Sequence, residues 1–281
     1  MNEKITIILL SHKSQNLIIN FVKKIYKKFQ IIIIDNSNDL NLKEIINKEY
    51  PKIFIDIINN NGYGAAINHA AKMVQTKYFL ISNPDIENLD EEKIIKFENV
   101  AKKLNDDFAT LGPRYENLNS KSIKQTDINQ EISEMKFLSG ACMFFKKKTF
   151  DILKGFDENF FLYFEESDFC LRASKLYKNY QVNSIKVNHN VGTSVSYKNE
   201  EEKNEFEKLY TWHFIWSKFY YFKKHYGFIF AILYFMPIII RINFRIILYG
   251  IKKDNINLIK YKTRKSGLYS SILNQKSSKR I

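Results

Sequence analysis

The sequence predicts an α/β protein: a mostly parallel sheet flanked by helices, followed by a C-terminal basic, aromatic, helical extension. Continuous apolar runs alternate with stretches of helical periodicity in the first hundred residues. Strands that are apolar on both faces are typical of parallel sheets covered on both sides. Residues 208–281 carry 15 Lys or Arg and one Asp, so they hold the whole net charge of +14. The basic character of the predicted extension rests on that charge.

Strands and helices are expected in strict alternation at first. The apolar runs predict strands over 5–10, 31–34, 53–58 and 78–82. Apolar residues at helical spacing predict helices over 17–29, 42–48, 64–74 and 90–104. Later we expect a strand over 108–112, a polar loop or hairpin over 114–133, a strand interrupted by Gly140 over 137–146, a helix within 160–175, and one or two short strands over 180–189.

The character of the chain changes near residue 200. Residues 200–224 are expected to be helical, and 225–240 follow without a formal charge. This stretch is shorter than the roughly 20 residues that a spanning helix needs. Arg241 and Arg245 lie in the apolar residues that follow, so we expect an interfacial helix or helical hairpin, with a buried pair of core helices as the alternative. The predicted domains are 1–205, catalytic, and 206–281, membrane-associating.

Composition excludes several classes. Apolar residues make up 45% of the 281, which is too many for a disordered or collagen-like chain. Two cysteines are too few for a disulfide framework, and we expect both to be reduced core residues. The apolar run after Met1–Lys4 is too short for a secretory signal. We therefore expect the protein in the cytosol or on the cytosolic face of a membrane.

Polar residues follow four of the expected strands, at Ser11-His12, Asp35-Asn36, Asn61-Gly62 and Asn83-Pro84-Asp85. The carboxyl ends of parallel strands meet at one edge, where α/β proteins bind ligands. A carboxylate at Asp85 can hold a divalent cation that neutralises a diphosphate, although Asn-Pro-Asp is also a common turn. Asp35 can accept a hydrogen bond from a nucleobase, with an Asx turn as the alternative.

Three further features have both a chemical and a structural interpretation. Gly62 and Gly64 permit close approach to a ligand, but a dinucleotide fingerprint lacks its third glycine. The acidic group Glu165, Glu166 and Asp168 can supply a general base beside apolar walls, or can complement a helix dipole and pair with Arg172. His189 can complete a metal site with Asp85 or be structural.

Together these residues resemble family 2 glycosyltransferases with the GT-A fold, especially the rhamnosyltransferase-like branch. The matching segments follow the family's order: Thr6–His12, Ile32–Ser37, Asn61–Asn68, Leu80–Asp85, Leu138–Met143, Gly155–Glu158, Phe164–Arg172, and His189 with Gly192 and Ser194. They cover roughly residues 4 to 195.

The resemblance implies inverting transfer of one sugar from a nucleoside-diphosphate sugar, dTDP-rhamnose or a UDP-hexose. It places the nucleotide sugar on Ser11, Asp35, Asn36, Asn61, Gly62, Gly64, Asn68, Asn83 and Gly140. It implies a divalent cation, Mg²⁺ or Mn²⁺, at Asp85 and His189. It gives the acceptor base to Glu166, with Glu165 and Asp168 as the other candidates. No Gln-x-x-Arg-Trp motif is found, which favours single addition over polymerisation.

The basic extension then fits an anionic membrane. We expect a peripheral enzyme on the cytoplasmic face of the plasma (inner) membrane that builds a cell-surface polysaccharide of the envelope. Its acceptor is expected to be a glycan, or one linked to polyprenyl diphosphate. Nucleic acid is not an expected partner. The alternatives are a basic nucleic-acid-binding module, which leaves the acidic edge unused, and a nucleotidyltransferase on a similar sheet.

Overall fold

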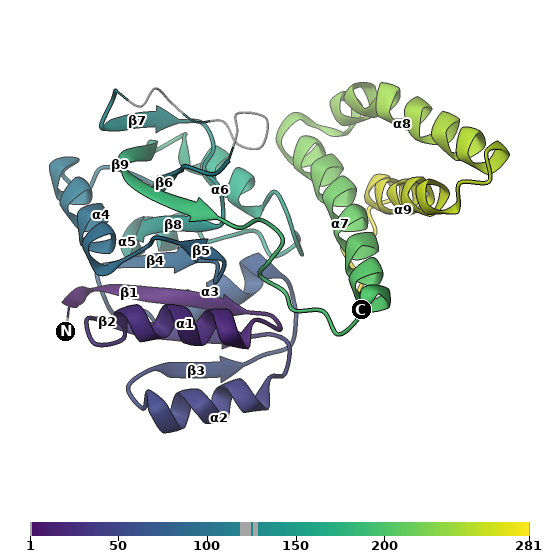
Figure 1. Ribbon diagram of the computed structural model, residues 1–281. Helices are drawn as coiled ribbons and strands as arrows, with labels where there is room; N and C mark the ends of the chain where they lie inside the picture. Colours follow the sequence, from purple (N-terminus) through teal and green to yellow (C-terminus); the bar gives the residue numbers. More distant parts are fainter. Residues whose placement is uncertain (1, 119–124, 126–128, 281) are drawn as a thin grey trace. The chain divides into compact units, whose positions relative to one another are not determined.

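The computed structural model describes residues 2–118, 125 and 129–280, and these form two compact units (Figure 1). The first comprises Met1–Asp157 and Glu166–Ser196. The second comprises Glu158–Glu165 and Tyr197–Ile281. Helix α7 (Glu200–Tyr226) runs through the predicted boundary between residues 205 and 206. The short segment before Glu166 groups with the C-terminal helices, although it lies within the catalytic stretch of the sequence.

One half of the first unit's sheet is parallel, as predicted. Its strands lie in the order β3-β2-β1-β4, with bounds β1 (Asn2–Ser11), β2 (Phe29–Asp35), β3 (Phe54–Ile57) and β4 (Tyr78–Ser82). Successive residues of β1 enter two different cores, Ile7 in one and Ile8 in the other. Both faces of β1, β2 and β4 are therefore buried over most of their length, which explains why these strands are continuous apolar runs in the sequence, whereas the edge strand β3 is only partly buried.

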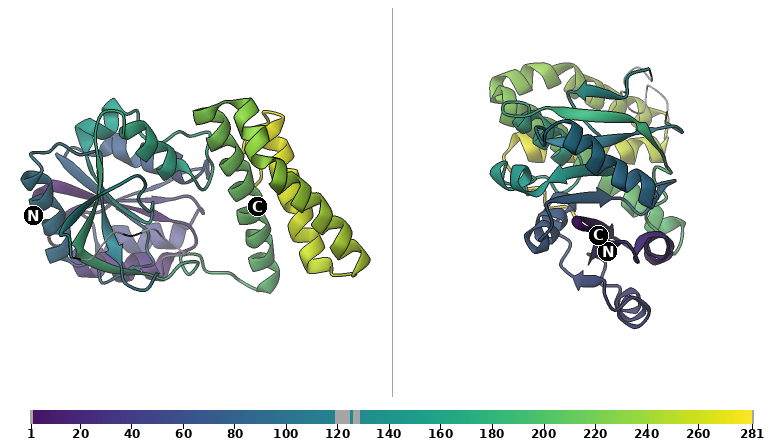
Figure 2. Two further views of the ribbon diagram at one scale, coloured as in Figure 1. Left: turned by 90° about the horizontal axis from the view of Figure 1, so that it is seen from above. Right: turned by 90° about the vertical axis from the view of Figure 1, so that its left-hand side faces the viewer.

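Helices cover the two faces of the sheet in two sets (Figure 2). The first core contains residues of α1 (Gln15–Ile25), α2 (Leu40–Glu49) and α4 (Glu91–Lys103). The second core contains residues of α3 (Tyr63–Met73), α5 (Lys147–Ile152) and α6 (Glu165–Ala173). The expected helices in the first hundred residues are all present, with ends shifted by a few residues.

The other half of the sheet is mixed. β8 (Cys142–Lys146) joins β4 antiparallel, and the order continues with β6 (Thr110–Tyr115), β9 (Asn179–His189) and β5 (Ile86–Glu87). β7 (Ile132–Met135) pairs with β9 antiparallel. β8 is shorter than the predicted strand over 137–146, and β9 is a single strand. Of the predicted loop over 114–133, residues 119–124 and 126–128 lie outside the described residues.

Three helices, α7, α8 (Phe228–Ile251) and α9 (Asn255–Ile272), make up most of the second unit. They share a core of their own that includes Phe219, Phe235 and Leu268. α7 and α9 approach closely at Gly267, where an added Cβ would lie 2.5 Å from the carbonyl oxygen of Trp212. The segment before Glu166 packs on α7, since the Ser217 hydroxyl donates to the carbonyl of Leu162 at 2.8 Å. The helical C-terminal extension is confirmed.

Candidate active site

Strand register brings the predicted nucleotide-binding residues to one edge of the sheet. Ser11 at the end of β1 is the partner of Asp35 at the end of β2, and both side chains are buried. The Asn36 N–H donates to the carbonyl of Ser11 at 3.1 Å. Because β1 and β2 are parallel, their carboxyl ends lie at the same edge, as the alternation of elements predicted.

A polar network joins three strand ends at this edge. His12 Nδ1 lies 2.7 Å from Asn36 Oδ1, and the Asn36 amide donates to Asn60 Oδ1 at 3.3 Å. Asn60 Oδ1 also accepts from the Gly62 N–H at 3.2 Å. Burial lowers the pKa of His12, which favours the neutral ring. His12 belongs to one of the polar clusters and Asn60 directly precedes another, but neither was a predicted site residue, because only tertiary pairing joins them.

The Asp35 carboxylate shapes its own turn. Its Oδ1 accepts from the N–H groups of Ser37 at 2.9 Å and Asp39 at 3.0 Å, and its Oδ2 accepts from the Ser37 hydroxyl at 2.9 Å. This is the Asx-turn arrangement that the sequence left as the alternative. Contact with a nucleobase stays a prediction, and any such contact would have to share these oxygens with the turn.

Asp85 and His189 form a buried pair. The Asp85 side chain is 1% exposed, and its Oδ1 lies 3.4 Å from His189 Nε2. That oxygen has no hydrogen-bond donor in the described structure. A buried carboxylate oxygen without a donor is costly, and a cation beside it would remove the cost. Among the residues that the structure describes, no group of three or more His, Cys, Asp and Glu could hold a metal.

The two-residue strand β5 is the reason for this pair. Ile86 pairs with His189 in β9, and the Asn190 N–H donates to the carbonyl of Asp85 at 3.2 Å. The Tyr115 ring packs on that of His189, with centroids 5.9 Å apart. β5 was missed from the sequence, because two residues carry no periodicity. Nevertheless it brings together two residues that lie a hundred positions apart.

Residues 140–141 link Asp85 to Glu166. The Asn83 N–H, two residues before Asp85, donates to the carbonyl of Ala141 at 2.8 Å. Glu166 packs against Gly140, the residue before Ala141: a Cβ added to Gly140 would be 3.4 Å from Glu166 Cβ. The carbonyl of Gly140 accepts from the Tyr63 hydroxyl at 2.7 Å, at the start of α3. The end of β4, the start of α3 and the start of α6 thus meet around one short segment.

The surroundings of Glu166, the predicted acceptor base, raise the pKa of its carboxyl. Its side chain is half-buried, and burial raises the pKa of its carboxyl above the ordinary value. Its Oε1 accepts from the Ser167 hydroxyl at 2.9 Å, which favours the ionised form. A raised pKa brings a carboxylate closer to the basicity that proton abstraction needs near neutral pH.

The chain is strained directly before this acidic group. Tyr163 and Phe164 have φ of 69° and 72°, in the left-handed region that costs a non-glycine residue about 1–2 kcal/mol. Aromatic contacts within the second unit hold them there. The Phe164 ring lies 5.8 Å from that of Phe214 and 5.5 Å from that of Tyr221. Strain held by packing is a recurrent feature of functional loops.

The other two acidic candidates differ from Glu166. Asp168 is fully buried, and its Oδ2 accepts from Arg172 Nε at 2.8 Å. The same guanidinium donates to the carbonyl of Gly155 at 2.6 Å, so the pair braces α6 against a turn. This geometry favours the structural alternative for Asp168. Glu165 is buried and groups with the second unit, whereas Glu166 groups with the first.

The predicted loop over Asn61–Asn68 has mixed roles. Gly62 adopts φ 106° immediately before α3, a conformation that favours glycine, and Gly64 is buried in the first turn. The side chain of Asn68 is occupied: its amide donates to the carbonyl of Phe156 and its oxygen accepts from the Phe156 N–H, both at 2.9 Å. Asn61 is exposed at the edge. Their contact with a nucleotide stays a prediction.

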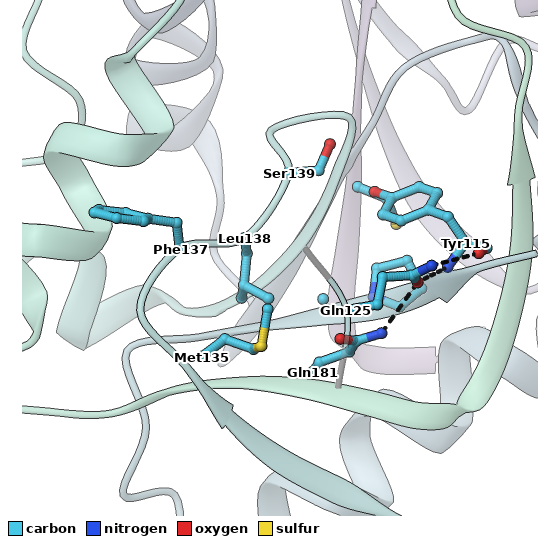
Figure 3. Close-up of a pocket in the computed structure, with 10 residues that line it drawn as sticks. Tyr115, Gln125, Met135, Phe137, Leu138, Ser139 and Gln181 are labelled. Atoms are coloured by element: carbon cyan, nitrogen blue, oxygen red, sulfur yellow. Dashed lines mark hydrogen bonds between the residues drawn. The ribbon is translucent and has the colours of Figure 1, made fainter. Parts of the chain in front are cut away.

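A small cavity lies under the segment before Gly140 (Figure 3). It is lined by Tyr115, Leu138 and Ser139 among others, and its volume of about 10 Å³ holds about one water molecule. Burial raises the pKa of Tyr115 well above its ordinary value, so its hydroxyl stays protonated. A sugar does not fit this cavity.

Comparison with known proteins decides the family. A family model described as glycosyl transferase family 2 matches residues 6–180, more than half of the chain. This chain belongs to glycosyltransferase family 2. The resemblance seen in the sequence is thereby confirmed, and the match covers the strand ends, Gly140 and Glu166 but ends before His189.

Curated relatives of this glycosyltransferase include a hexosyltransferase and a rhamnosyltransferase. The low-salt glycan biosynthesis hexosyltransferase Agl10 of Haloferax volcanii is 22% identical over 197 residues, which are 62% of this chain and 63% of that protein. Rhamnosyltransferase WbbL of Escherichia coli is 24% identical over 247 residues, 74% of this chain and 88% of that one. The match thus spans less than two thirds of the first relative.

Solved structures confirm the GT-A fold of this glycosyltransferase. The mannosyltransferase PcManGT of Pyrobaculum calidifontis, solved with GDP-Man and Mn²⁺, has a TM-score of 0.58 at 11% identity, over 97% of this chain and 88% of that one. Staphylococcus aureus TarS 1–349, solved with UDP-GlcNAc, has a TM-score of 0.54 at 14% identity, over 97% and 92%. Both likenesses are of fold.

Proposed function

We propose that this enzyme transfers one sugar from a nucleoside-diphosphate sugar to an acceptor hydroxyl by a single displacement with inversion. The observation that carries the proposal is the buried Asp85–His189 pair, joined to Glu166 through residues 140–141. The Asp85–His189 pair would bind the diphosphate leaving group, and the Glu166 carboxylate, with its raised pKa, would accept the proton. Such a displacement needs both groups.

Glu166 takes the proton of the acceptor hydroxyl as the acceptor oxygen attacks the anomeric carbon. The new bond forms on the face opposite the leaving diphosphate, so the configuration inverts. The bond between the anomeric carbon and the diphosphate oxygen breaks, with an oxocarbenium-like transition state of the kind known for glycosidases. The edge formed by Ser11, Asp35, Asn36 and Gly62 holds the nucleotide.

Asp85 and His189 are the residues that would hold a divalent cation, together with diphosphate oxygens. The donor-free Asp85 oxygen and the facing imidazole nitrogen fit Mn²⁺ or Mg²⁺, which accept oxygen and nitrogen ligands. When bound, the cation supplies positive charge to the diphosphate. Because the chain would supply only two ligands and the diphosphate would add others, cation and donor should bind cooperatively.

Substitution of Asp85 tests this assignment. Asp85→Ala should weaken binding of the donor and of Mn²⁺ together, each by about tenfold or more, as measured by calorimetric titration. The chain offers a matched control in its other Asp–His pair, Asp56 and His69, which are 2.8 Å apart and partly exposed. Asp56→Ala should change both affinities by less than about twofold. Unchanged titration of Asp85→Ala would refute the metal assignment.

The donor and acceptor are proposed by class. We propose dTDP-rhamnose or a UDP-hexose as donor, and a glycan or a polyprenyl-diphosphate-linked glycan of the cell surface as acceptor. We place this sugar transfer at the cytoplasmic face of the plasma membrane, because an anionic membrane attracts residues 208–281 with their net charge of +14. A donor screen tests the class: release of UDP, dTDP or GDP supports sugar transfer, whereas release of pyrophosphate would indicate nucleotidyl transfer.

A further inference from the structure

Helix α8 has two apolar faces, and only one of them is packed. The packed face contributes Ala231, Phe235 and Ile242 to the core shared with α7 and α9. The other face is a continuous exposed stripe. Its residues recur every three or four positions and are 43–77% exposed: Ile229, Leu233, Met236, Ile240, Phe244, Ile247 and Ile251. Spacing of this kind follows one side of a helix, here for its whole length of about 36 Å.

By length and composition α8 is the one described helix that could cross a membrane, and only 17% of its most apolar stretch is buried. The helices packed beside it argue against crossing. Lys265 of α9 donates to Asn243 Oδ1 at 2.9 Å, alongside the interior of α8. Lys218 of α7 lies 6.0 Å from the ring centroids of Tyr234 and Phe235. These cations flank the middle of α8 and not its ends.

If α8 crossed a bilayer, its neighbours would carry these cations to the hydrocarbon centre. Arg241 and Arg245, within α8 itself, lie on either side of Asn243 in the sequence, so they would lie close to the depth of Lys265. Charges at the centre of a bilayer are costly, and long cationic side chains reach water only from near an interface. If the same helix lay parallel to the surface, its stripe would enter the lipid and the cations would stay at the level of the headgroups.

We propose that α8 lies in the plane of an anionic membrane surface, with the stripe Ile229–Ile251 inserted into one leaflet, and does not span the bilayer. Lipid is the favoured occupant because charge complements the apolar stripe: Lys252 and Lys253 end the helix, and residues 208–281 carry the net charge of +14. A second copy of this chain would bring the same positive charge against itself. The inference rests on the membrane surface of the proposed function, but not on its chemistry.

Vesicle binding by the full chain tests the lipid partner. Leu233→Glu should weaken binding to phosphatidylcholine–phosphatidylglycerol vesicles by about tenfold or more, and wild type should bind phosphatidylcholine vesicles far less. The matched control is Leu176→Glu in the first unit, because Leu176 and Leu233 are both 65% exposed. The control should bind within about twofold of wild type. Equal loss in both variants, or in neither, would overturn the proposal.

Labelling tests the orientation. Cys142 and Cys170 are fully buried, and burial raises the pKa of the Cys170 thiol to about 12, so both are poor targets. Single cysteines replacing Ile229, Ile240 or Ile251 can carry a fluorophore that a membrane-impermeant reductant bleaches. With protein added to sealed vesicles, all three should sit at similar shallow depth and bleach from outside. One protected end with a deep Ile240 label would show a spanning helix.

Two further results would overturn the proposal. Labels that stay solvent-exposed with vesicles would show that lipid does not cover the stripe. Labels shielded without vesicles, in proportion to protein concentration, would show that a second copy covers it. Donor affinity of the same variants, measured by calorimetry without vesicles, should equal that of wild type. That measurement separates failure of this inference from failure of the proposed reaction.

Discussion

The two units of this glycosyltransferase use charge in opposite ways. In the first unit two buried carboxylates face a cationic or titratable partner: Asp85 lies beside His189, and Asp168 pairs with Arg172. In the second unit cations are many, and they border an exposed apolar helix. Residues 1–207 have no net charge, whereas residues 208–281 have +14. The difference shows that the role of a buried carboxylate depends on the residue it is paired with. The role of a surface charge depends on whether apolar side chains surround it.

The strongest test of this comparison separates two carboxylates of α6. Glu166→Gln should lower turnover by about 10² or more, with stability and donor affinity kept, because the amide cannot accept the acceptor's proton. Asp168→Asn should instead lower the free energy of unfolding by about 3–5 kcal/mol, because it leaves Arg172 without its buried partner. Steady-state kinetics measures the change in turnover, and urea unfolding measures the change in the free energy of unfolding.

The exposed Glu49→Gln on α2 serves as the control and should change neither quantity. Near-normal turnover of Glu166→Gln would remove that residue from the role of base. A stable Asp168→Asn with greatly reduced turnover would restore Asp168 as a catalytic candidate and blur the contrast between catalytic and bracing carboxylates.

A smaller effect is expected from pH in the second unit. His213 is fully buried, with Nδ1 2.8 Å from the Ser277 hydroxyl and Nε2 2.9 Å from the carbonyl of Lys279. Burial first, and then the charges of Arg280 and Lys279, lower its pKa from 6.5 to about 4. The folded state disfavours the proton, so this stability is complete above pH 6.5 and is lost as the pH falls towards 4.

The loss should reach about 3 kcal/mol. Trp212 and Trp216, the chain's two tryptophans, flank His213, so their fluorescence reports unfolding of the second unit. His213→Gln should remove this part of the pH dependence and leave the part due to carboxylates. Equal pH dependence in wild type and variant would show that His213 is not held neutral.

The smallest effect concerns two glycines of the same unit. Gly267→Ala should destabilise by about 1–3 kcal/mol, because its Cβ would meet the Trp212 carbonyl oxygen at 2.5 Å and Ile215 Cγ2 at 2.9 Å. Gly250→Ala is the matched control: nothing lies within 4 Å of its added Cβ, so it should be neutral or stabilise by about 0.5–1 kcal/mol. Thermal unfolding followed by tryptophan fluorescence measures both. Equal stability would contradict the close α7–α9 packing.

Much of the first unit could be predicted because its signals are local. The parallel strands β1, β2 and β4 are buried on both faces, so runs such as Ile31–Ile34 can be recognised as strands without knowledge of their partners. The edge site followed from the same alternation, since parallel strands must end together. Resemblance to the family's motifs led to the prediction of Asp85 and Glu166 as site residues. Spacing alone could not choose the base among Glu165, Glu166 and Asp168.

The sequence by itself determined the alternation of strands and helices, the family and the concentration of charge in the last residues. Only the tertiary structure decided which distant residues meet. Pairing of β5 with β9 brings Asp85 to His189, and the ion pair with Arg172 gives Asp168 a structural role. Packing on α7 and α9 covers one face of α8 and leaves the other exposed. The periodicity of apolar residues shows which side of a segment is buried. Which segments pair with one another depends on burial and hydrogen bonding between residues far apart in the chain.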